Sequence, residues 1–347
     1  MTTSLERQIG QMLLVGFRGL ELTTHSPIFE DLHTRHLGGV ILFDYDSALK
    51  SPCRNIQSRD QLRALLQALS ESASGPLLLS IDQEGGRVSR LKERFGFRPT
   101  VSARFLGERN SLELTTQYAG QTAGLLKDLG FNLNLAPVVD LHLNSASPAI
   151  NAVERSFSRD PDTVIAHAGA WIREHRQQGI LCALKHFPGH GSADQDTHHG
   201  FVDVSNSWLA EELIPYRALI REGLADLIMT AHIFQAGLDP KWPATLSEKI
   251  IGGLLRRELA YHGVVLSDDL QMKAISSHYS LETVIYQAIN AGVDILTFGN
   301  NLTYDAQVVP KAIAIIKDLV AQKAVSEQRI GESFQRICRL KEQLSTP

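Results

Sequence analysis

One loop of this 347-residue chain concentrates more potential catalytic chemistry than any other segment. Lys185-His-Phe-Pro-Gly-His-Gly191 is followed by Asp196-Thr-His198, and Asp194 lies between the two. These residues come directly after the apolar run 179–184, which is typical of a buried strand. Proline lacks a backbone N–H and glycine favours irregular backbone angles, so the loop should not be helical. A dense polar cluster on a rigid scaffold is the usual construction of a catalytic site.

Asp196 and His198 have the spacing of an acid–base pair. With one residue between them, their side chains would lie on the same side of an extended segment, close enough for the carboxylate to bond one imidazole nitrogen. That bond would fix the tautomer, stabilise the imidazolium form and present the other nitrogen to a substrate. The spacing therefore predicts general acid–base chemistry at His198.

Two alternatives stay open for the same loop. It could be a solvated polar surface without a ligand, or its histidines and carboxylates could hold zinc or iron. Histidines four residues apart, such as His186 and His190, bind one metal ion when a helix places them on the same face. The Pro188-Gly189 pair between them prevents a helix and so argues against the metal. The residues that a metal would use are His186, His190, His198, His199, Asp194 and Asp196.

A second candidate group, Ser267-Asp268-Asp269, follows the apolar run 264–266. Asp268 comes first after this predicted strand and should point inward, where it would place a carboxylate at the end of the sheet. Serine and aspartate are also common N-cap residues, so the pair could equally begin the next helix. Asp269 fits that cap better than Asp268.

A third group, Asp82-Gln-Glu-Gly-Gly-Arg-Val-Ser-Arg90, follows the apolar run 77–81. A glycine-rich phosphate loop is not expected here, because the adjacent carboxylates would repel the anion. Acceptors and arginines at a strand end suit a polyhydroxylated ligand, and a turn held by its own salt bridges is the alternative. Glu154-Arg155-Ser-Phe157 stands directly before a predicted helix start and could be purely structural.

Eight short apolar or β-branched runs are available to position these groups, and longer segments with helical periodicity separate them. The runs lie at 12–17, 39–43, 77–81, 133–139, 180–184, 227–230, 264–266 and 295–298. Among the predicted helices, 60–73 places four leucines on one face, and Asp160-Pro161 begins another that ends at Gly179. A further helix should run from Ser247 to Gly263, and two amphipathic helices should follow from about 305.

Eight strands that alternate with helices indicate an α/β protein with a parallel sheet, and eight is the number that closes a (β/α)8 TIM barrel. An open doubly wound sheet is the alternative. The barrel is favoured because polar residues follow several different strands, whose C-terminal ends share one face in a barrel. These residues are Asp82, Asp140, Lys185, His186, His232 and Asp268. No linker marks a boundary, so we predict one domain over residues 1–347.

The composition argues against several classes of protein. Apolar residues make up 43% and charged residues 21%, and the net charge of −4 does not suit a nucleic-acid binder. No apolar run approaches the roughly 18 residues that cross a bilayer, and the N-terminus does not read as a signal peptide. The three cysteines are far apart and suggest neither disulfides nor a zinc motif. We expect a cytoplasmic protein, and a monomer.

Together these segments resemble glycoside hydrolase family 3, and its β-N-acetylhexosaminidase branch in particular. The resemblance spans most of the chain in the family's order. The matching segments are Asp82-Gln-Glu-Gly-Gly-Arg-Val88, Glu154-Arg-Ser-Phe157, the loop from Lys185 to His198, Met229-Thr-Ala-His232 and Ser267-Asp-Asp-Leu-Gln-Met272. This resemblance implies a single (β/α)8 domain, no metal or organic cofactor, and no room for the extra C-terminal domain of larger members.

The resemblance also implies an activity, that of a retaining exo-β-N-acetylglucosaminidase acting on small carbohydrates, with muropeptides of cell-wall recycling as the implied substrates. It makes Asp268 the nucleophile and His198 the general acid/base, oriented by Asp196. The residues implied to hold the N-acetylglucosamine are Asp82, Arg90, Arg155, Lys185 and His186. Gln271 and Ser192-Ala193 depart from the family's pattern, but neither is a predicted catalytic group.

Several alternatives use the same residues. The chain could be a phosphorylase, because a neutral histidine base does not repel phosphate, or a β-glucosidase of the same family. A non-catalytic sugar-binding barrel is disfavoured because candidates for both nucleophile and acid/base are present. A metal hydrolase would lose activity to a chelator. His199 stays a rival for the acid/base role, and the role of His232 is open.

Overall fold

The strands close into a barrel in this computed structural model, which describes residues 3–345. Neighbouring strands pair in parallel in the order β10-β1-β2-β3-β4-β5-β7-β9, and a parallel bridge between Leu266 and Ile295 joins the last of these strands to the first. The barrel strands are β1 (Leu13–Gly16), β2 (Gly39–Leu42), β3 (Leu78–Ile81), β4 (Leu133–Asn134), β5 (Leu181–Phe187), β7 (Leu227–Thr230), β9 (Val264–Ser267) and β10 (Leu296–Phe298). The predicted (β/α)8 barrel is confirmed.

All eight barrel strands are buried along their whole length. Side chains fill the inside of such a barrel and helices cover its outside, so both faces of each strand must be apolar. This is why the strands appear in the sequence as continuous apolar runs rather than as an alternating pattern.

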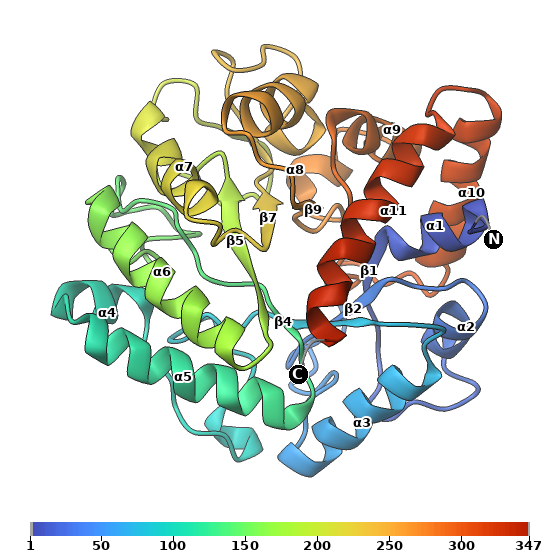
Figure 1. Cartoon of the computed structure of the whole chain (residues 1–347), viewed down its shortest axis with the longest axis horizontal. Coiled ribbons are helices and arrows are strands. Elements are labelled where there is room, and N and C mark those ends of the chain that lie inside the picture. The colour runs from blue at the N-terminus through green and yellow to red at the C-terminus, as the bar shows by residue number, and fades with distance from the viewer. Residues whose placement is uncertain (1–2, 346–347) are drawn as a thin grey trace.

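Helices surround the barrel (Figure 1). They are α1 (Leu5–Gln11), α2 (Pro27–His33), α3 (Arg59–Ser72), α4 (Ala103–Arg109), α5 (Leu112–Leu129), α6 (Pro161–Gln177), α7 (Ile214–Arg221), α8 (Lys273–Ser276), α9 (Leu281–Ala291), α10 (Val308–Ala321) and α11 (Glu327–Glu342). As predicted, Asp160 caps α6 through the Thr163 N–H. No helix within residues 3–345 has the length and apolar character that crossing a membrane requires.

The structure differs from the prediction in four elements. Strand β4, predicted over 133–139, ends at Asn134. Strand β5 continues to Phe187, so Lys185 and His186 belong to the strand rather than to the loop. The helix predicted up to Gly263 is a wide, π-type helix over Lys249–Glu258, and it ends early because Ala260 takes a left-handed φ of 52°. A small second sheet of β6 (Val202–Asp203) and β8 (Ile233–Phe234) was not predicted.

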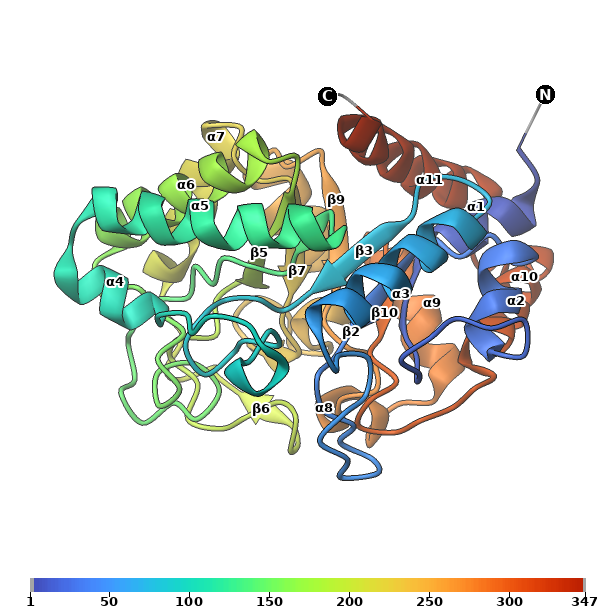
Figure 2. The ribbon, with the colours of Figure 1, turned by 90° about the horizontal axis from the view of Figure 1, so that it is seen from below.

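The C-terminal helix α11 lies at the end of the barrel opposite β6 and α8 (Figure 2). Its Lys341 is 4% exposed, and its ammonium donates to Gln11 Oε1 at 2.7 Å and to the carbonyl oxygens of Gly38 and Pro76 at 2.7 and 2.8 Å. These acceptors stand before β1, β2 and β3. Lys341 therefore ties α11 to the N-terminal ends of three strands, although burial lowers its pKa to about 7.

Replacing Lys341 by methionine should destabilise the fold, because the methyl end keeps the packing but leaves the acceptors unsatisfied. We expect the free energy of unfolding to fall by about 3 kcal/mol in urea titrations. Lys127→Met on the exposed side of α5 is the matched control and should change stability by less than about 0.5 kcal/mol. Equal stability of the two variants would mean that relief of the buried charge offsets the lost hydrogen bonds.

Candidate active site

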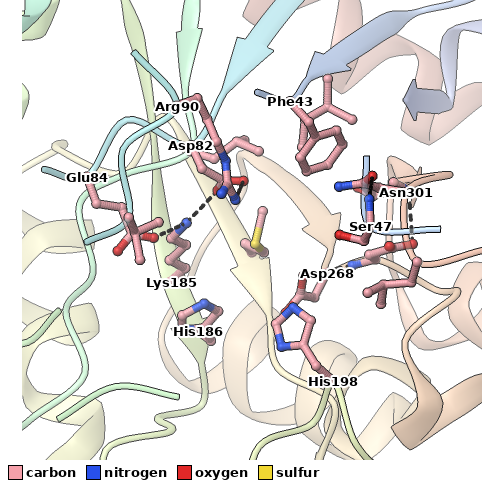
Figure 3. Close-up of a pocket in the computed structure, with 18 of the residues that line it drawn as sticks. Phe43, Ser47, Asp82, Glu84, Arg90, Lys185, His186, His198, Asp268 and Asn301 are labelled. Atoms are coloured by element: carbon pink, nitrogen blue, oxygen red, sulfur yellow. Dashed lines mark hydrogen bonds and ion pairs between the residues drawn. The ribbon is translucent and has the colours of Figure 1, made fainter. Parts of the chain in front are cut away.

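A cavity of about 310 Å³ opens at the C-terminal ends of the barrel strands. Figure 3 shows charged side chains on one wall of the cavity and Phe43, Ser47 and Asn301 on the other, which we call the neutral wall. Asp268 and His198 lie nearer the neutral wall. The predicted site residues that line this cavity are Asp82, Arg90, Arg155, Lys185, His186, His198 and Asp268. Four segments of the chain that are distant in sequence are thereby brought together, at 82–90, 155, 185–198 and 268, and of the predicted residues only Asp196 does not line the cavity.

A network of alternating charges forms the first wall. The Lys185 ammonium, 2% exposed, contacts Asp82 Oδ1 at 2.8 Å and Glu84 Oε1 at 2.6 Å. Arg90 reaches the other oxygen of Asp82 at 3.2 Å. Burial alone would raise the pKa of Asp82, but Lys185 and Arg90 hold it well below its usual range. These carboxylates therefore stay ionised, and their cations fix their orientation.

Arg155 extends this network. Its guanidinium binds Glu84 with two parallel hydrogen bonds, both of 2.8 Å, the geometry in which arginine holds a carboxylate most firmly. Glu84 belongs to a segment that the sequence marked, but it was not among the predicted substrate-binding residues. Its position two residues after Asp82 was the available signal. In the structure it joins the strand-end lysine to the arginine of a distant loop.

His186 is fixed between Asp140 and Arg155. Its Nδ1 lies 2.7 Å from Asp140 Oδ2, and its Nε2 lies 3.1 Å from Arg155. Because arginine only donates, Nε2 accepts, and the ring proton on Nδ1 goes to Asp140. Asp140 also accepts the backbone N–H of His186 and of His190. Asp140 was noted at a strand end but not predicted as a site residue, since only the fold reveals its partner.

His198 is paired with Asp196, as the spacing predicted. Its Nδ1 lies 2.7 Å from Asp196 Oδ1, which also accepts the His198 backbone N–H at 2.9 Å. The segment forms a turn rather than the predicted extended strand, because an aspartate carboxylate that accepts the N–H two residues later bends the chain. Burial would lower the pKa of His198, but the Asp196 bond and the charge of Asp268 raise it. Its side chain is 48% exposed, so Nε2 remains accessible.

The two other histidines occupy different positions. His199 is exposed and does not line the cavity. His232 is buried behind the site, with Nε2 at 2.9 Å from the Asp269 carbonyl oxygen and Nδ1 at 2.8 Å from the Thr245 hydroxyl. Burial lowers its pKa. His232 therefore supports the backbone next to Asp268 rather than facing the cavity.

Asp268 follows β9 and points into the cavity (Figure 3). Its Oδ1 accepts the Asp269 N–H at 2.8 Å, and no ion pair engages it within residues 3–345. Burial would raise its pKa, but His232, His186 and His198 together lower it. Asp268 is thus an ionised carboxylate without a hydrogen-bonding side chain, which leaves it available to react.

The prediction that Asp269 caps the next helix is wrong. Helix α8 begins at Lys273 with Met272 at its N-cap. Asp269 instead accepts the N–H of Gln271 at 3.0 Å and that of Gly299 at 2.9 Å, which joins the end of β9 to the end of β10. Burial raises the pKa of Asp269 to about 6.

The neutral wall was not predicted. Ser47 follows β2 and Asn301 follows β10, and the Ser47 N–H donates to Asn301 Oδ1 at 2.9 Å. Neither loop carries a residue pattern that suggests chemistry, so only the fold reveals their contribution. Within residues 3–345, no three histidine, cysteine, aspartate or glutamate side chains gather as they would around a metal ion.

Comparison with known proteins places these observations in a family. The description "Glycosyl hydrolase family 3 N terminal domain" matches residues 4–340. The chain is 32% identical to beta-hexosaminidase A of Pseudoalteromonas piscicida over 99% of its own length and 62% of that protein's. It is 35% identical to the beta-hexosaminidase of Tolumonas auensis over 83% of each chain.

Solved structures agree in fold. A glycoside hydrolase family 3 beta-N-acetylglucosaminidase from Paenibacillus sp. strain FPU-7 has a TM-score of 0.90 and 33% identity, over 99% of this chain and 63% of that one. The beta-N-acetylhexosaminidase from Beutenbergia cavernae has a TM-score of 0.85 and 27% identity, over 98% and 99%. This chain spans less than two thirds of the Pseudoalteromonas and Paenibacillus proteins. On the family match and these relatives, the chain belongs to glycosyl hydrolase family 3.

Proposed function

We propose that the chain is a retaining exo-β-N-acetylglucosaminidase, that is, a β-N-acetylhexosaminidase that removes terminal non-reducing N-acetyl-D-hexosamine residues. One observation carries the proposal: a single cavity holds an ionised carboxylate at Asp268 and an imidazole at His198 whose pKa is raised. Glycoside cleavage through a covalent intermediate needs a nucleophile and a group that both gives and takes a proton. The relatives named as beta-hexosaminidases support the choice of sugar.

In the first step, His198 donates the proton on Nε2 to the glycosidic oxygen while Asp268 attacks the anomeric carbon. The bond between that carbon and the leaving oxygen breaks, and the sugar becomes an ester of Asp268. Most glycosidases use a carboxylic acid as proton donor. An imidazole with an ordinary pKa near 6.5, raised here by Asp196, is protonated near neutral pH without the burial that a glutamic acid needs.

In the second step, the now neutral His198 takes a proton from water, and the resulting hydroxide equivalent attacks the anomeric carbon. Asp268 leaves as a carboxylate, and two inversions give overall retention. Asp196 accepts the Nδ1 proton throughout, which keeps Nε2 as the nitrogen that exchanges protons. No metal or organic cofactor takes part in this proposal.

The charged wall serves as the binding site for the non-reducing sugar. Carboxylates and cations that already neutralise one another offer rigid acceptors and donors to sugar hydroxyl groups. The residues proposed for this role are Asp82, Arg90, Arg155, Lys185 and His186, with Glu84 holding two of the cations. A cavity of about 310 Å³ suits one terminal sugar residue, which supports exo action.

We extend the proposal to the biological setting. The substrates are small N-acetylglucosaminides, including peptidoglycan-derived muropeptides, and the enzyme works in cell-wall recycling in the cytoplasm. Residues 1–347 act as one catalytic domain and as a monomer. The protein from Beutenbergia cavernae, 99% of which this chain covers, supports the single barrel.

Phosphorolysis is a second candidate, and the imidazole at His198 favours it. After the first step this base is neutral, so a phosphate anion that approaches the anomeric carbon meets less repulsion than beside a carboxylate base. The same Asp268 ester would then be cleaved by phosphate instead of water.

The proposal is tested by release of p-nitrophenol from its N-acetyl-β-D-glucosaminide and from its β-D-glucoside, each in phosphate-free buffer and with phosphate. We expect hydrolysis of the acetamido sugar without phosphate. Activity confined to the glucoside would make the protein a β-glucosidase, and a strong rise with phosphate would make it a phosphorylase. No activity on either sugar would contradict the proposal and favour a sugar-binding barrel.

The alkaline limb of the pH profile should depend on Asp196. Only protonated His198 can act as the acid, so kcat/KM for a substrate with a poor leaving group falls as pH rises through the pKa of His198. Asp196→Asn replaces the carboxylate that raises this pKa by a neutral amide, and the fall should therefore move to lower pH. Asp194→Asn is the matched control, because Asp194 is an exposed carboxylate of the same loop. A limb that stays in place in Asp196→Asn would contradict the pairing.

A further inference from the structure

Glu212 is a buried carboxyl group that the proposed mechanism does not use. It lies in a short 3-10 turn, Ala210–Leu213, directly before α7, and is 1% exposed. It makes no ion pair within residues 3–345, which is unusual for a buried acid. A buried carboxyl is costly unless its hydrogen-bonding capacity is satisfied, so its partners indicate why it is there.

Both oxygens of Glu212 bind the loop that carries Asp196 and His198. Oε2 accepts the Gly191 N–H at 2.9 Å, and Oε1 lies 2.7 Å from the Ser192 hydroxyl. The contact is close, because a Cβ atom on Gly189 would lie 2.5 Å from the Glu212 Cβ. Glycine at position 189 is therefore needed for the Glu212 side chain to reach the loop.

The carbonyl group of the same residue, Gly191, is also held by hydrogen bonds. The Gly191 carbonyl oxygen accepts from the Asn144 N–H at 3.2 Å and from Asn151 Nδ2 at 3.1 Å. A Cβ atom on Gly191 would lie 1.8 Å from the Leu141 carbonyl oxygen, so only glycine fits there. Glu212 thus closes a clamp around Gly191, with the loop after β4 on the opposite side.

Only a few residues separate the clamped Gly191 from the acid/base pair, so the position of Gly191 affects the position of that pair. The Ala193 carbonyl oxygen is held by Asn144 Nδ2 at 3.2 Å, and the Thr197 carbonyl oxygen accepts the Ala274 N–H of α8 at 3.2 Å. Only residues 194–196 lie between these anchors, and Asp196 is one of them. A shift of Gly191 and Ser192 would therefore displace Asp196, and the His198 ring that it holds.

We propose that Glu212 is a positioning residue for the general acid/base: it fixes the loop so that His198 meets the leaving oxygen. This inference rests on the proposed function, because it assumes that His198 protonates the leaving group. Glu212 can keep both contacts whether its carboxyl group is protonated or ionised. When protonated it donates to the Ser192 hydroxyl and still accepts from Gly191; when ionised it accepts from both. Burial, which raises its pKa to about 7, is consistent with the neutral form.

The test compares leaving groups. Glu212→Ala removes both hydrogen bonds and should lower kcat/KM on chitobiose, which has a poor leaving group, by up to about 100-fold, the scale of a catalytic group misplaced by about 1 Å. The loss on the p-nitrophenyl glycoside, which needs little protonation, should be much smaller. A fold that is merely less stable would lose activity equally on both substrates.

Two variants control this comparison. Glu212→Gln should restore most of the activity, because its carbonyl can accept from Gly191 and its amide can donate to the Ser192 hydroxyl. Glu211→Ala changes the neighbouring glutamate, whose side chain makes no hydrogen bond or ion pair within residues 3–345, and should behave as the unchanged protein. If Glu212→Ala fails to fold, Ser192→Ala, which removes one of the two bonds, should show a smaller loss of the same kind.

His198→Ala separates the two proposals. Its kcat/KM, which reports the step that needs the acid, should fall roughly 100- to 10,000-fold on chitobiose and far less on the aryl glycoside. If His198→Ala loses equally on both substrates, the proposed acid role fails. If it shows the difference but Glu212→Ala loses equally on both or not at all, or if Glu212→Gln is as impaired as Glu212→Ala, the positioning role of Glu212 is overturned.

Discussion

Closure of the sheet between β9 and β10 is the constraint on which the rest of the structure depends. The bridge between Leu266 and Ile295 turns an open row of parallel strands into a ring, so the C-terminal ends of all eight strands face one mouth. Without this pairing Asp268, at the end of β9, would stand at the sheet's edge. Closure places it on the same cavity as Lys185, which lies near the end of β5.

Charge compensation decides how that mouth can hold so many ionisable groups. Asp82 and Glu84 both pair with Lys185. Asp82 also pairs with Arg90 and Glu84 with Arg155, while Asp140 fixes the tautomer of His186. Each of these buried charges has a partner, which is the condition for its survival away from water. The two groups proposed to do chemistry are held differently, although His198 does pair with Asp196. Asp268 has no ion pair within residues 3–345, and His198 is half exposed. Under the proposed function, the paired charges bind the sugar, while Asp268 and the Nε2 atom of His198 carry out the reaction.

The sequence predicted the parts of this arrangement that depend on local pattern. Apolar runs located all eight strands, and polar residues directly after them located the mouth. The pairing of Asp196 with His198 was predicted correctly but for a different geometry, because a turn rather than an extended segment brings them together. Partners that meet only through the fold were not predicted. Asp140 and Glu212 look like ordinary acids in the sequence, and their roles follow from contacts to residues 46 and 21 positions away.

The central claim is that Asp268 forms an ester with the sugar, and intact-protein mass spectrometry tests it most directly. In His198→Ala the second step lacks its base, so an aryl N-acetyl-β-D-glucosaminide should load the enzyme faster than water releases it. We predict a mass increase of one N-acetylhexosaminyl residue, assigned by peptide fragmentation to Asp268. Attachment to another residue, or rapid turnover of this variant on the aryl glycoside with no adduct, would contradict the account.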